Sequence, residues 1–239
     1  MVPLDREEGE RWLAQARHTL ASGERDLEEG DYDWASFKAH QAGQYALKGL
    51  LRGLGRPAFG HALFRLLQAL AETGLVIPPV LEEGARLLDA HYIPARYPDA
   101  YPEGSPYEYY TPSRAKEALQ AARSILGRCG MAWKALEGRR AEWESLLDEA
   151  KAFAQRVRQA LGEARVYLYG SVARGVFNVE SDIDLLVVSP HLPKDPLERF
   201  TFLQRLNPGR VEARGLTPEE FARLRAKGAL WWLEGAREL

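Results

Sequence analysis

The 239-residue chain contains a single cysteine, Cys129, which excludes an internal disulfide and a cysteine-rich zinc site. It has no apolar run long enough to cross a membrane, and its first residues lack the pattern of a secretory signal. Its formal net charge is only −2, so no general attraction to a nucleic-acid backbone is expected. These absences predict a cytoplasmic protein without a membrane partner, and they do not exclude local basic patches.

What is present is ample material for a core, because 46% of the residues are hydrophobic and 28% are charged. Apolar residues recur at helical spacing through the first two thirds of the chain. This spacing predicts the helices 5–21, 31–54, 61–71, 79–91, 113–127 and 131–161, with breaks at Ser22-Gly23 and at Gly127–Gly130. Short apolar runs that are typical of strands appear only after residue 162. The pattern predicts an α+β protein in two parts.

Residues 91–112, with the sequence HYIPARYPDAYPEGSPYEYYTP, interrupt the helical pattern. The prolines rule out a regular helix, and so many tyrosines are atypical of a disordered linker. We therefore expect an ordered, partly exposed loop packed on the bundle.

The stretch with the most chemical information is residues 165–188, RVYLYGSVARGVFNVESDIDLLVV. An apolar run stops at Gly170-Ser171, and a second apolar run follows Asp182 and Asp184. Residues i and i+2 of a strand point to the same face, so Asp182 and Asp184 should project together. Two adjacent carboxylates repel each other unless a cation lies between them, and Mg²⁺ or Mn²⁺ prefers such oxygen ligands.

Gly170 and Ser171 sit where a turn enters a helix, and free backbone N–H groups at such a position can bind a phosphate. A phosphate site beside two carboxylates is typical of phosphoryl or nucleotidyl transfer. The alternative is that Gly170 is only a turn residue, Arg174 a surface charge and Asp182 a cap.

This stretch resembles the minimal nucleotidyltransferases of the DNA polymerase β-like superfamily, whose motif is G-S-x-A-R-G, a loop, and S-D-x-D-L. The resemblance implies an α/β fold with a small mixed sheet, ATP as substrate and divalent metal ions held by Asp182, Asp184 and a third carboxylate. Glu212 stands where the family usually has Asp, before the turn Thr217–Glu220. Gly170 and Ser171 would then contact the phosphates, with Arg174 and Ser181 supporting the loop.

Residues 5–128 resemble HEPN domains, which are all-α antiparallel bundles often encoded beside minimal nucleotidyltransferases. The matching stretches are Gln41–Lys48, the helix start at His61, and Tyr92–Ala100. The resemblance implies a homodimer by analogy. We predict three parts with these bounds: a HEPN-like bundle at 1–130, a connecting helix at 131–162 and a nucleotidyltransferase domain at 163–239.

Many HEPN proteins resemble metal-independent ribonucleases with an Arg-x4–6-His motif, and Arg86 and His91 satisfy that spacing. His91 would act as general acid or base, and Arg86 would hold a phosphate. The alternative is a surface arginine and a histidine at a helix end.

Some paired nucleotidyltransferases resemble enzymes that transfer AMP to a tyrosine of their HEPN partner, as in toxin–antitoxin pairs. Tyr92 and Tyr97 are acceptor candidates here, and the alternative is that the tyrosine cluster packs on the bundle. The leading hypothesis is therefore a metal-dependent nucleotidyltransferase that moves AMP from ATP to a hydroxyl of a protein, or of an RNA. The alternatives are a HEPN ribonuclease regulated by its fused domain, and a non-catalytic nucleotide-binding module.

Overall fold

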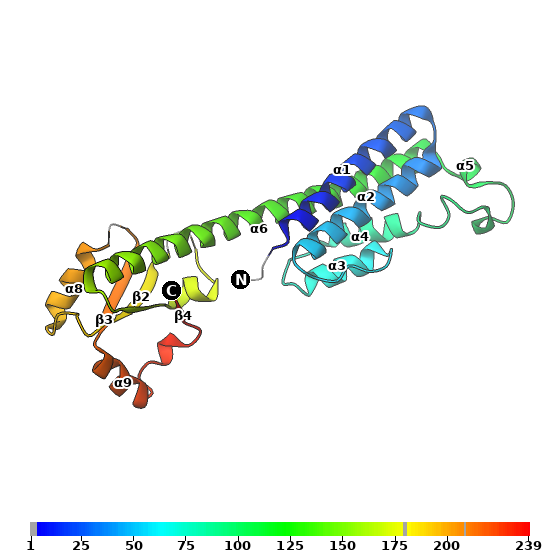
Figure 1. The fold of residues 1–239 in the computed structure, drawn as a ribbon. Helices are drawn as coiled ribbons and strands as arrows, with labels where there is room; N and C mark the ends of the chain where they lie inside the picture. The colour runs from blue at the N-terminus through cyan, green and yellow to red at the C-terminus, as the bar shows by residue number, and fades with distance from the viewer. Residues whose placement is uncertain (1–3, 179–180, 208) are drawn as a thin grey trace. The chain divides into compact units, whose positions relative to one another are not determined.

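The computed structural model describes residues 4–178, 181–207 and 209–239, and it divides them into two compact units. The helical unit extends to Glu137, and the α/β unit begins at Gly138 and ends at Leu239. This architecture confirms the predicted fold class, an all-α bundle followed by an α/β part with a small mixed sheet (Figure 1). Within the described ranges, no helix combines the length and the apolar character that crossing a lipid bilayer requires.

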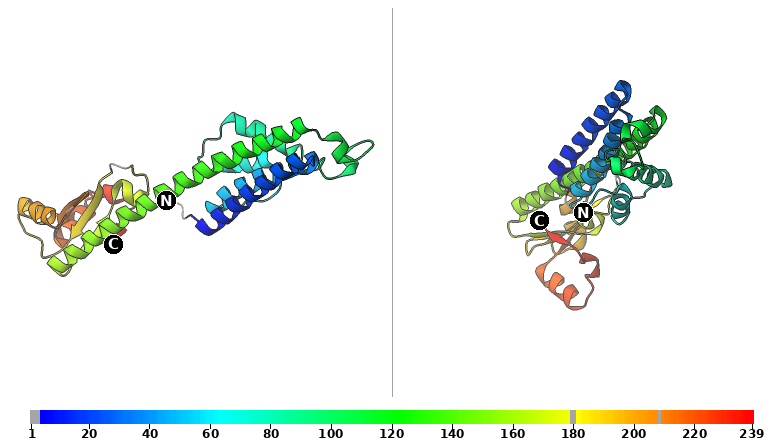
Figure 2. Two further views of the ribbon diagram at one scale, coloured as in Figure 1. Left: turned by 90° about the horizontal axis from the view of Figure 1, so that it is seen from above. Right: turned by 90° about the vertical axis from the view of Figure 1, so that its right-hand side faces the viewer.

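The helices of the helical unit are α1 (Arg6–Glu29), α2 (Tyr32–Gly53), α3 (Leu63–Ala71), α4 (Pro79–Asp89), α5 (Pro106–Tyr109) and the first part of α6 (Pro112–Leu161), with the short 3₁₀-helix η1 (Pro98–Ala100) before α5. The long helices α1 and α2 lie side by side, as the two further views in Figure 2 show. The start of α1 follows from its sequence, because the carboxylate of Asp5 accepts the N–H of Glu8.

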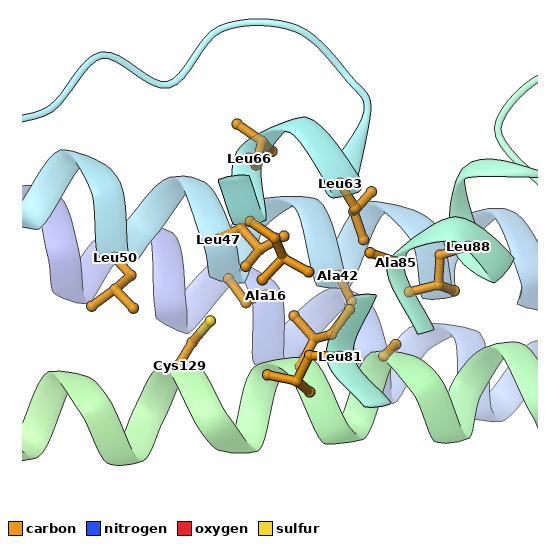
Figure 3. Packing of buried hydrophobic residues seen from close by; sticks show 14 of the residues in the cluster. Ala16, Ala42, Leu47, Leu50, Leu63, Leu66, Leu81, Ala85, Leu88 and Cys129 are labelled. Atoms are coloured by element: carbon orange, nitrogen blue, oxygen red, sulfur yellow. The ribbon is translucent and has the colours of Figure 1, made fainter. Parts of the chain in front are cut away.

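Leucine and alanine fill the core of the helical unit, and Figure 3 shows Leu47, Leu81 and Cys129 directed into the space between the helices. Trp133 of α6 is fully buried, and its indole N–H donates to Glu10 at 2.7 Å. Gly9 and Gly53 lie against the Trp133 ring, where a Cβ atom on either would clash. Small residues on α1 and α2 therefore make room for the largest side chain of the core.

Two predicted helix breaks are wrong. The helix expected to end at Ser22-Gly23 continues to Glu29, because Gly23 is buried and lets α2 approach, with Lys38 Cβ 3.1 Å from the position of its missing Cβ. The break expected at Gly127–Gly130 does not occur either, and α6 is one helix from Pro112 to Leu161. A glycine inside a helix costs only about 1 kcal/mol, and the burial of Ile125, Cys129 and Trp133 on one face exceeds that cost.

The segment 91–112 is ordered, as expected, and holds η1 and α5 between stretches of turn. A buried hydrogen bond of 3.0 Å joins His91 Nδ1 to the Tyr110 hydroxyl, and the rings of Tyr101 and Tyr109 stack with centroids 4.0 Å apart. The first contact joins the two ends of the segment, and the second lies within it, so side chains of the segment hold it together.

In the α/β unit, the described residues form a four-stranded sheet in the order β3-β2-β1-β4. The strands are β1 (Arg165–Leu168), β2 (Ile183–Val188), β3 (Val211–Leu216) and β4 (Arg237–Glu238), and the helices are α7 (Gly170–Arg174), α8 (Pro196–Arg205) and α9 (Pro218–Ala226), with the 3₁₀-helix η2 (Trp231–Leu233). β2 is antiparallel to β1 and parallel to β3, so the sheet is mixed.

The two faces of this sheet differ in what covers them. Ile183, Leu185 and Val187 of β2 pack with Phe153 and Val157 from the last part of α6. The alternate residues Asp184, Leu186 and Val188 face the other side, where the residues around α9 and η2 provide a smaller cluster. The alternation therefore places Asp184 on the face that has the smaller cluster.

Candidate active site on the open sheet face

The acidic residues of the site come from neighbouring parallel strands. In the register of β2 and β3, Asp184 is paired with Glu212, so the two side chains lie next to each other on the same face. Asp184 is half-buried and Glu212 is exposed. The chain thus places a third acid, which the resemblance had suggested at Glu212, directly beside Asp184.

Tyr169 extends this row across the sheet. Its backbone N–H donates to the Asp184 carbonyl at 3.0 Å, and its buried ring contacts Trp232 at a centroid distance of 4.7 Å. Arg214, two residues beyond Glu212, lies on the same face with its guanidinium 5.7 Å from the Trp232 ring centroid. The sequence interpretation missed Tyr169, Arg214 and Trp232 as neighbours of the acids, although two-residue alternation from Glu212 already points to Arg214.

Gly170 brings the turn between β1 and α7 against the side chain of Asp184. Its φ is +74°, and a Cβ atom there would lie 3.0 Å from Cγ of Asp184 and closer still to Oδ2. A side chain at this position would therefore be strained in backbone and would also displace the carboxylate. Ser171 follows in the first turn of α7 and is half-buried.

The charges of the site act on Asp184. Burial raises the pKa of the Asp184 carboxyl, and the nearby carboxylates of Glu212 and Asp182 raise it further. Arg214 and Arg174 oppose this rise in pKa, but they do not cancel it. Burial also raises the pKa of the Tyr169 phenol, which Asp184 and Glu212 reinforce and Arg214 opposes. The site has more negative charge than its own arginines neutralise, which is the condition that favours binding of a cation.

The remaining predicted residues lie around this row. Asp182 is exposed and immediately precedes β2, and its negative charge contributes to the raised pKa of Asp184. The Ser181 hydroxyl accepts the N–H of Asn178 at 2.9 Å, so its observed contact closes the loop. Arg174 is exposed at the end of α7. Val179 and Glu180 of the same loop lie outside the described residues.

The carboxylates of the site can supply some of the ligands of a hard divalent cation such as Mg²⁺, but not all of them. Asp184 and Glu212 supply adjacent carboxylate oxygens, and Mg²⁺ is commonly held by one or two carboxylates together with substrate phosphates and water. Over residues 4–178, 181–207 and 209–239, however, no three His, Cys, Asp or Glu side chains are close enough to hold a metal ion. The residues therefore fit a metal whose other ligands come from the substrate.

In the helical unit, the structure does not bring Arg86 and His91 into contact. The Arg86 guanidinium lies 3.9 Å from the Phe64 ring centroid and pairs with Glu82 at 3.4 Å. His91 is 4% exposed against Tyr110, and burial, followed by the charges of Arg114 and His40, lowers the pKa of its imidazole to about 4. A neutral, buried His91 is poorly suited to exchange protons with a substrate near neutral pH.

The two acceptor candidates have different surroundings. The ring of Tyr92 stacks on His61 at 4.8 Å and lies under the Arg96 guanidinium at 4.4 Å. Tyr97 also contacts Arg96, at 4.9 Å, but 51% of the residue is exposed. Tyr97 is therefore the more accessible of the two.

The sequence analysis did not predict the cluster of buried polar side chains that lies beside Tyr92. The fully buried His40 contacts the His61 carbonyl at 3.1 Å through Nε2, and the amide of Gln44 donates to the same carbonyl at 3.0 Å. Asp89 accepts the backbone N–H groups of Leu63 and Phe64 at the start of α3. These contacts fix the first turn of α3, so the cluster has a structural role in the bundle.

Comparison with known protein families also divides the chain into two parts. Residues 9–132 match the HEPN domain family, and residues 150–227 match the nucleotidyltransferase domain family. No curated protein matches the chain.

Three of the solved structures that resemble this chain each match it over 52% of its length. The structure of TT1696 from Thermus thermophilus is 45% identical with a TM-score of 0.50, and 96% of that chain is covered. ST0689, described as an archaeal HEPN homologue, is 36% identical with a TM-score of 0.44 and 96% covered. A HEPN domain protein from Thermotoga maritima is 29% identical with a TM-score of 0.43 and 98% covered.

Proposed function

The chain belongs to the HEPN family and carries a nucleotidyltransferase domain beside the HEPN domain, and we propose that it transfers AMP from ATP to a hydroxyl group. The observation that carries this proposal is the pairing of Asp184 with Glu212 next to Gly170, because it joins adjacent carboxylates to a backbone turn that only glycine permits. The turn at Gly170 and Ser171 would contact the phosphates of ATP.

Asp184 and Glu212 would hold the divalent cation together with the phosphates of the substrate, and the charge of Asp182 would add to the attraction for the cation. When bound, Mg²⁺ neutralises the phosphates and stabilises the charge that develops on the leaving oxygen. The acceptor oxygen forms a bond to the α-phosphorus, the bond from that phosphorus to the bridging oxygen breaks, and pyrophosphate leaves. Glu212 is more exposed than Asp184, which supports our proposal that Glu212 takes the proton of the acceptor hydroxyl.

For the acceptor we propose a protein tyrosine, with Tyr97 favoured over Tyr92 by its exposure. Addition of AMP to Tyr97 would place a phosphate beside Arg96, whose guanidinium already contacts that ring. Such a modification would alter the surface of the HEPN domain, which is the effect expected in a toxin–antitoxin-like fusion or within a homodimer.

The ribonuclease alternative is not favoured by any contact in the described chain, because His91 is buried against Tyr110. The non-catalytic alternative depends on the longer side chain of Glu212. It predicts binding of Mg-ATP without release of pyrophosphate, and the same assay distinguishes it.

The test is pyrophosphate release and intact-mass analysis of the full chain with ATP and Mg²⁺. The wild type should release pyrophosphate and gain the mass of AMP, and Asp184→Asn should lower the rate by roughly 100-fold or more, because several kcal/mol of charge stabilisation is lost. Asp148→Asn, at an exposed acid of α6, is the matched control and should keep the wild-type rate.

Asp184→Asn is not expected to unfold the chain. The raised pKa of Asp184 means that its charged form is disfavoured in the folded state, so a neutral amide should maintain or slightly raise the melting temperature at neutral pH without metal. Tyr97→Phe should remove the added mass of AMP and lower pyrophosphate release with it, because the acceptor hydroxyl is lost. A full rate in Asp184→Asn would refute the assignment of the site.

A further inference from the structure

A groove of about 530 Å³ opens in the α/β unit between β1, α9 and η2. Its walls are mainly aromatic and apolar, and they include Tyr167, Phe221, Leu230 and Trp231, with Arg225 and Glu234 also lining it. This volume falls in the range of about 300–1,000 Å³ that is usual for small-molecule sites.

The groove lies on the same sheet face as the acids and close to them. Tyr167 is two residues before Tyr169 on that face, and it pairs with Leu186, which is two residues after Asp184. Two residues of a strand span about 7 Å, so the groove begins one side-chain row from the acid pair. Trp232 of η2 contacts Tyr169, so the segment that forms the groove also reaches the acid row.

The chemistry of the groove suits a flat ring with polar edges. The rings of Phe221 and Tyr167 stack with an interplanar angle of 6°, and Trp231 is 78% exposed, which is unusual for so large an aromatic side chain. Over the described parts of the chain, the side chains of Arg225 and Glu234 have no hydrogen-bond or ion-pair partner. A donor and an acceptor beside exposed aromatic faces match the edge and the faces of a purine.

We propose that this groove binds the purine base of the nucleotide whose phosphates lie at Gly170 and Asp184, with the base stacked on Trp231. The inference rests on the proposed nucleotidyl transfer for its choice of ligand and adds the subsite that selects the base. A purine offers a larger stacking surface than a pyrimidine, so the groove would favour ATP and GTP over CTP and UTP.

The first test measures binding without metal or chemistry. AMP and ribose 5-phosphate differ only by the base, and each is titrated calorimetrically into the full chain in EDTA. AMP should bind the wild type more tightly than ribose 5-phosphate. Trp231→Ala should weaken AMP binding about tenfold, since base–aromatic stacking is worth about 1–3 kcal/mol, and Trp231→Phe should restore most of the affinity.

Trp34→Ala is the matched control, because Trp34 is also an exposed tryptophan, at 48%, but belongs to the helical unit. It should leave AMP binding unchanged. Equal binding of AMP and ribose 5-phosphate to the wild type, including no binding of either, would overturn the proposal. So would an AMP affinity that Trp231→Ala does not alter, or a preference for a tyrosine-containing peptide over AMP.

The second test separates this inference from the proposed function. In the pyrophosphate assay, Trp231→Ala should raise KM for ATP about tenfold and leave kcat nearly unchanged, because the base is remote from the reacting phosphorus. If the wild type binds AMP through Trp231 but releases no pyrophosphate, the base site stands and the transfer reaction fails. If transfer occurs with an unchanged KM in Trp231→Ala, the reaction stands and the base site is refuted.

Discussion

The helical unit and the α/β unit treat their polar groups in opposite ways. In the helical unit, the buried His40, Gln44 and His91 are turned toward carbonyl and hydroxyl partners that hold a helix start or a loop. In the α/β unit, Asp184 is half-buried beside a second acid, and its raised pKa records the unfavourable charge. Polar groups that stabilise a fold are paired within it, whereas groups poised for a ligand are left with charge to neutralise.

The largest expected difference between the two units is the effect of replacing one glycine in each unit by alanine. Gly170→Ala should destabilise the α/β unit by several kcal/mol and lower pyrophosphate release at least 100-fold, because the methyl group would occupy the position of the Asp184 carboxylate. Gly74→Ala in the helical unit, at φ +89° with open space around it, should cost only about 1–2 kcal/mol. Both losses are measured by urea unfolding.

The activity of Gly74→Ala should equal that of the wild type. Equal losses of stability in the two variants, with activity retained in Gly170→Ala, would show that the turn does not press on Asp184. The contrast between a site glycine and an ordinary turn glycine would then disappear.

A smaller effect should follow pH in the helical unit. The pKa of His91 is about 4 in the folded chain and near 6.5 when unfolded, so the unfolded chain binds more protons between these values. Stability should therefore fall as the pH drops from 6.5 to 4, by about 3 kcal/mol in total. His91→Gln, which keeps a hydrogen-bonding group beside Tyr110, should flatten this slope in urea unfolding followed at several pH values.

His18→Gln, at an exposed histidine of α1, is the control for the loss of a histidine that is not buried. RNA cleavage in EDTA that disappears in His91→Gln would contradict the structural role and return the ribonuclease hypothesis. It would also end the contrast between the two units.

The smallest effect concerns the continuity of α6. Gly127→Ala should stabilise the helical unit by about 0.5–1 kcal/mol, because its Cβ would enter open space and alanine favours the helix. Gly9→Ala should destabilise the same unit by about 1–3 kcal/mol, since its Cβ would lie 2.5 Å from Cζ2 of Trp133. Thermal unfolding distinguishes the two signs, and a destabilising Gly127→Ala would indicate a break in the helix at that point.

Local sequence patterns predict much of the fold, but they fail at glycines, because a glycine can either end a helix or lie within one. The α+β division and the positions of β1 and β2 follow from apolar periodicity, and the structure confirms them. The pattern also predicts helix ends at Gly23 and Gly127, but one admits a neighbouring helix and the other merely faces open space. A single sequence does not distinguish these cases, because the distinction depends on what packs against the glycine.

The same limit applies to the candidate site. The alternation in SDIDLL placed Asp182 and Asp184 near a strand start, and the resemblance added Glu212. The neighbours Tyr169 and Trp232 come from strand pairing and from the C-terminal segment, which no local pattern connects to the acids. Arg86 and His91 fit a spacing rule, yet their side chains lie in different surroundings.

By itself, the sequence determined the division into a helical part and an α/β part, because periodicity of apolar residues is a local property that needs no partner. Only the tertiary structure decided that Glu212 stands beside Asp184 and that an aromatic groove opens one row away. Strand register and the docking of η2 depend on contacts between residues far apart in the chain, and burial of the apolar sheet face selects one register over its neighbours.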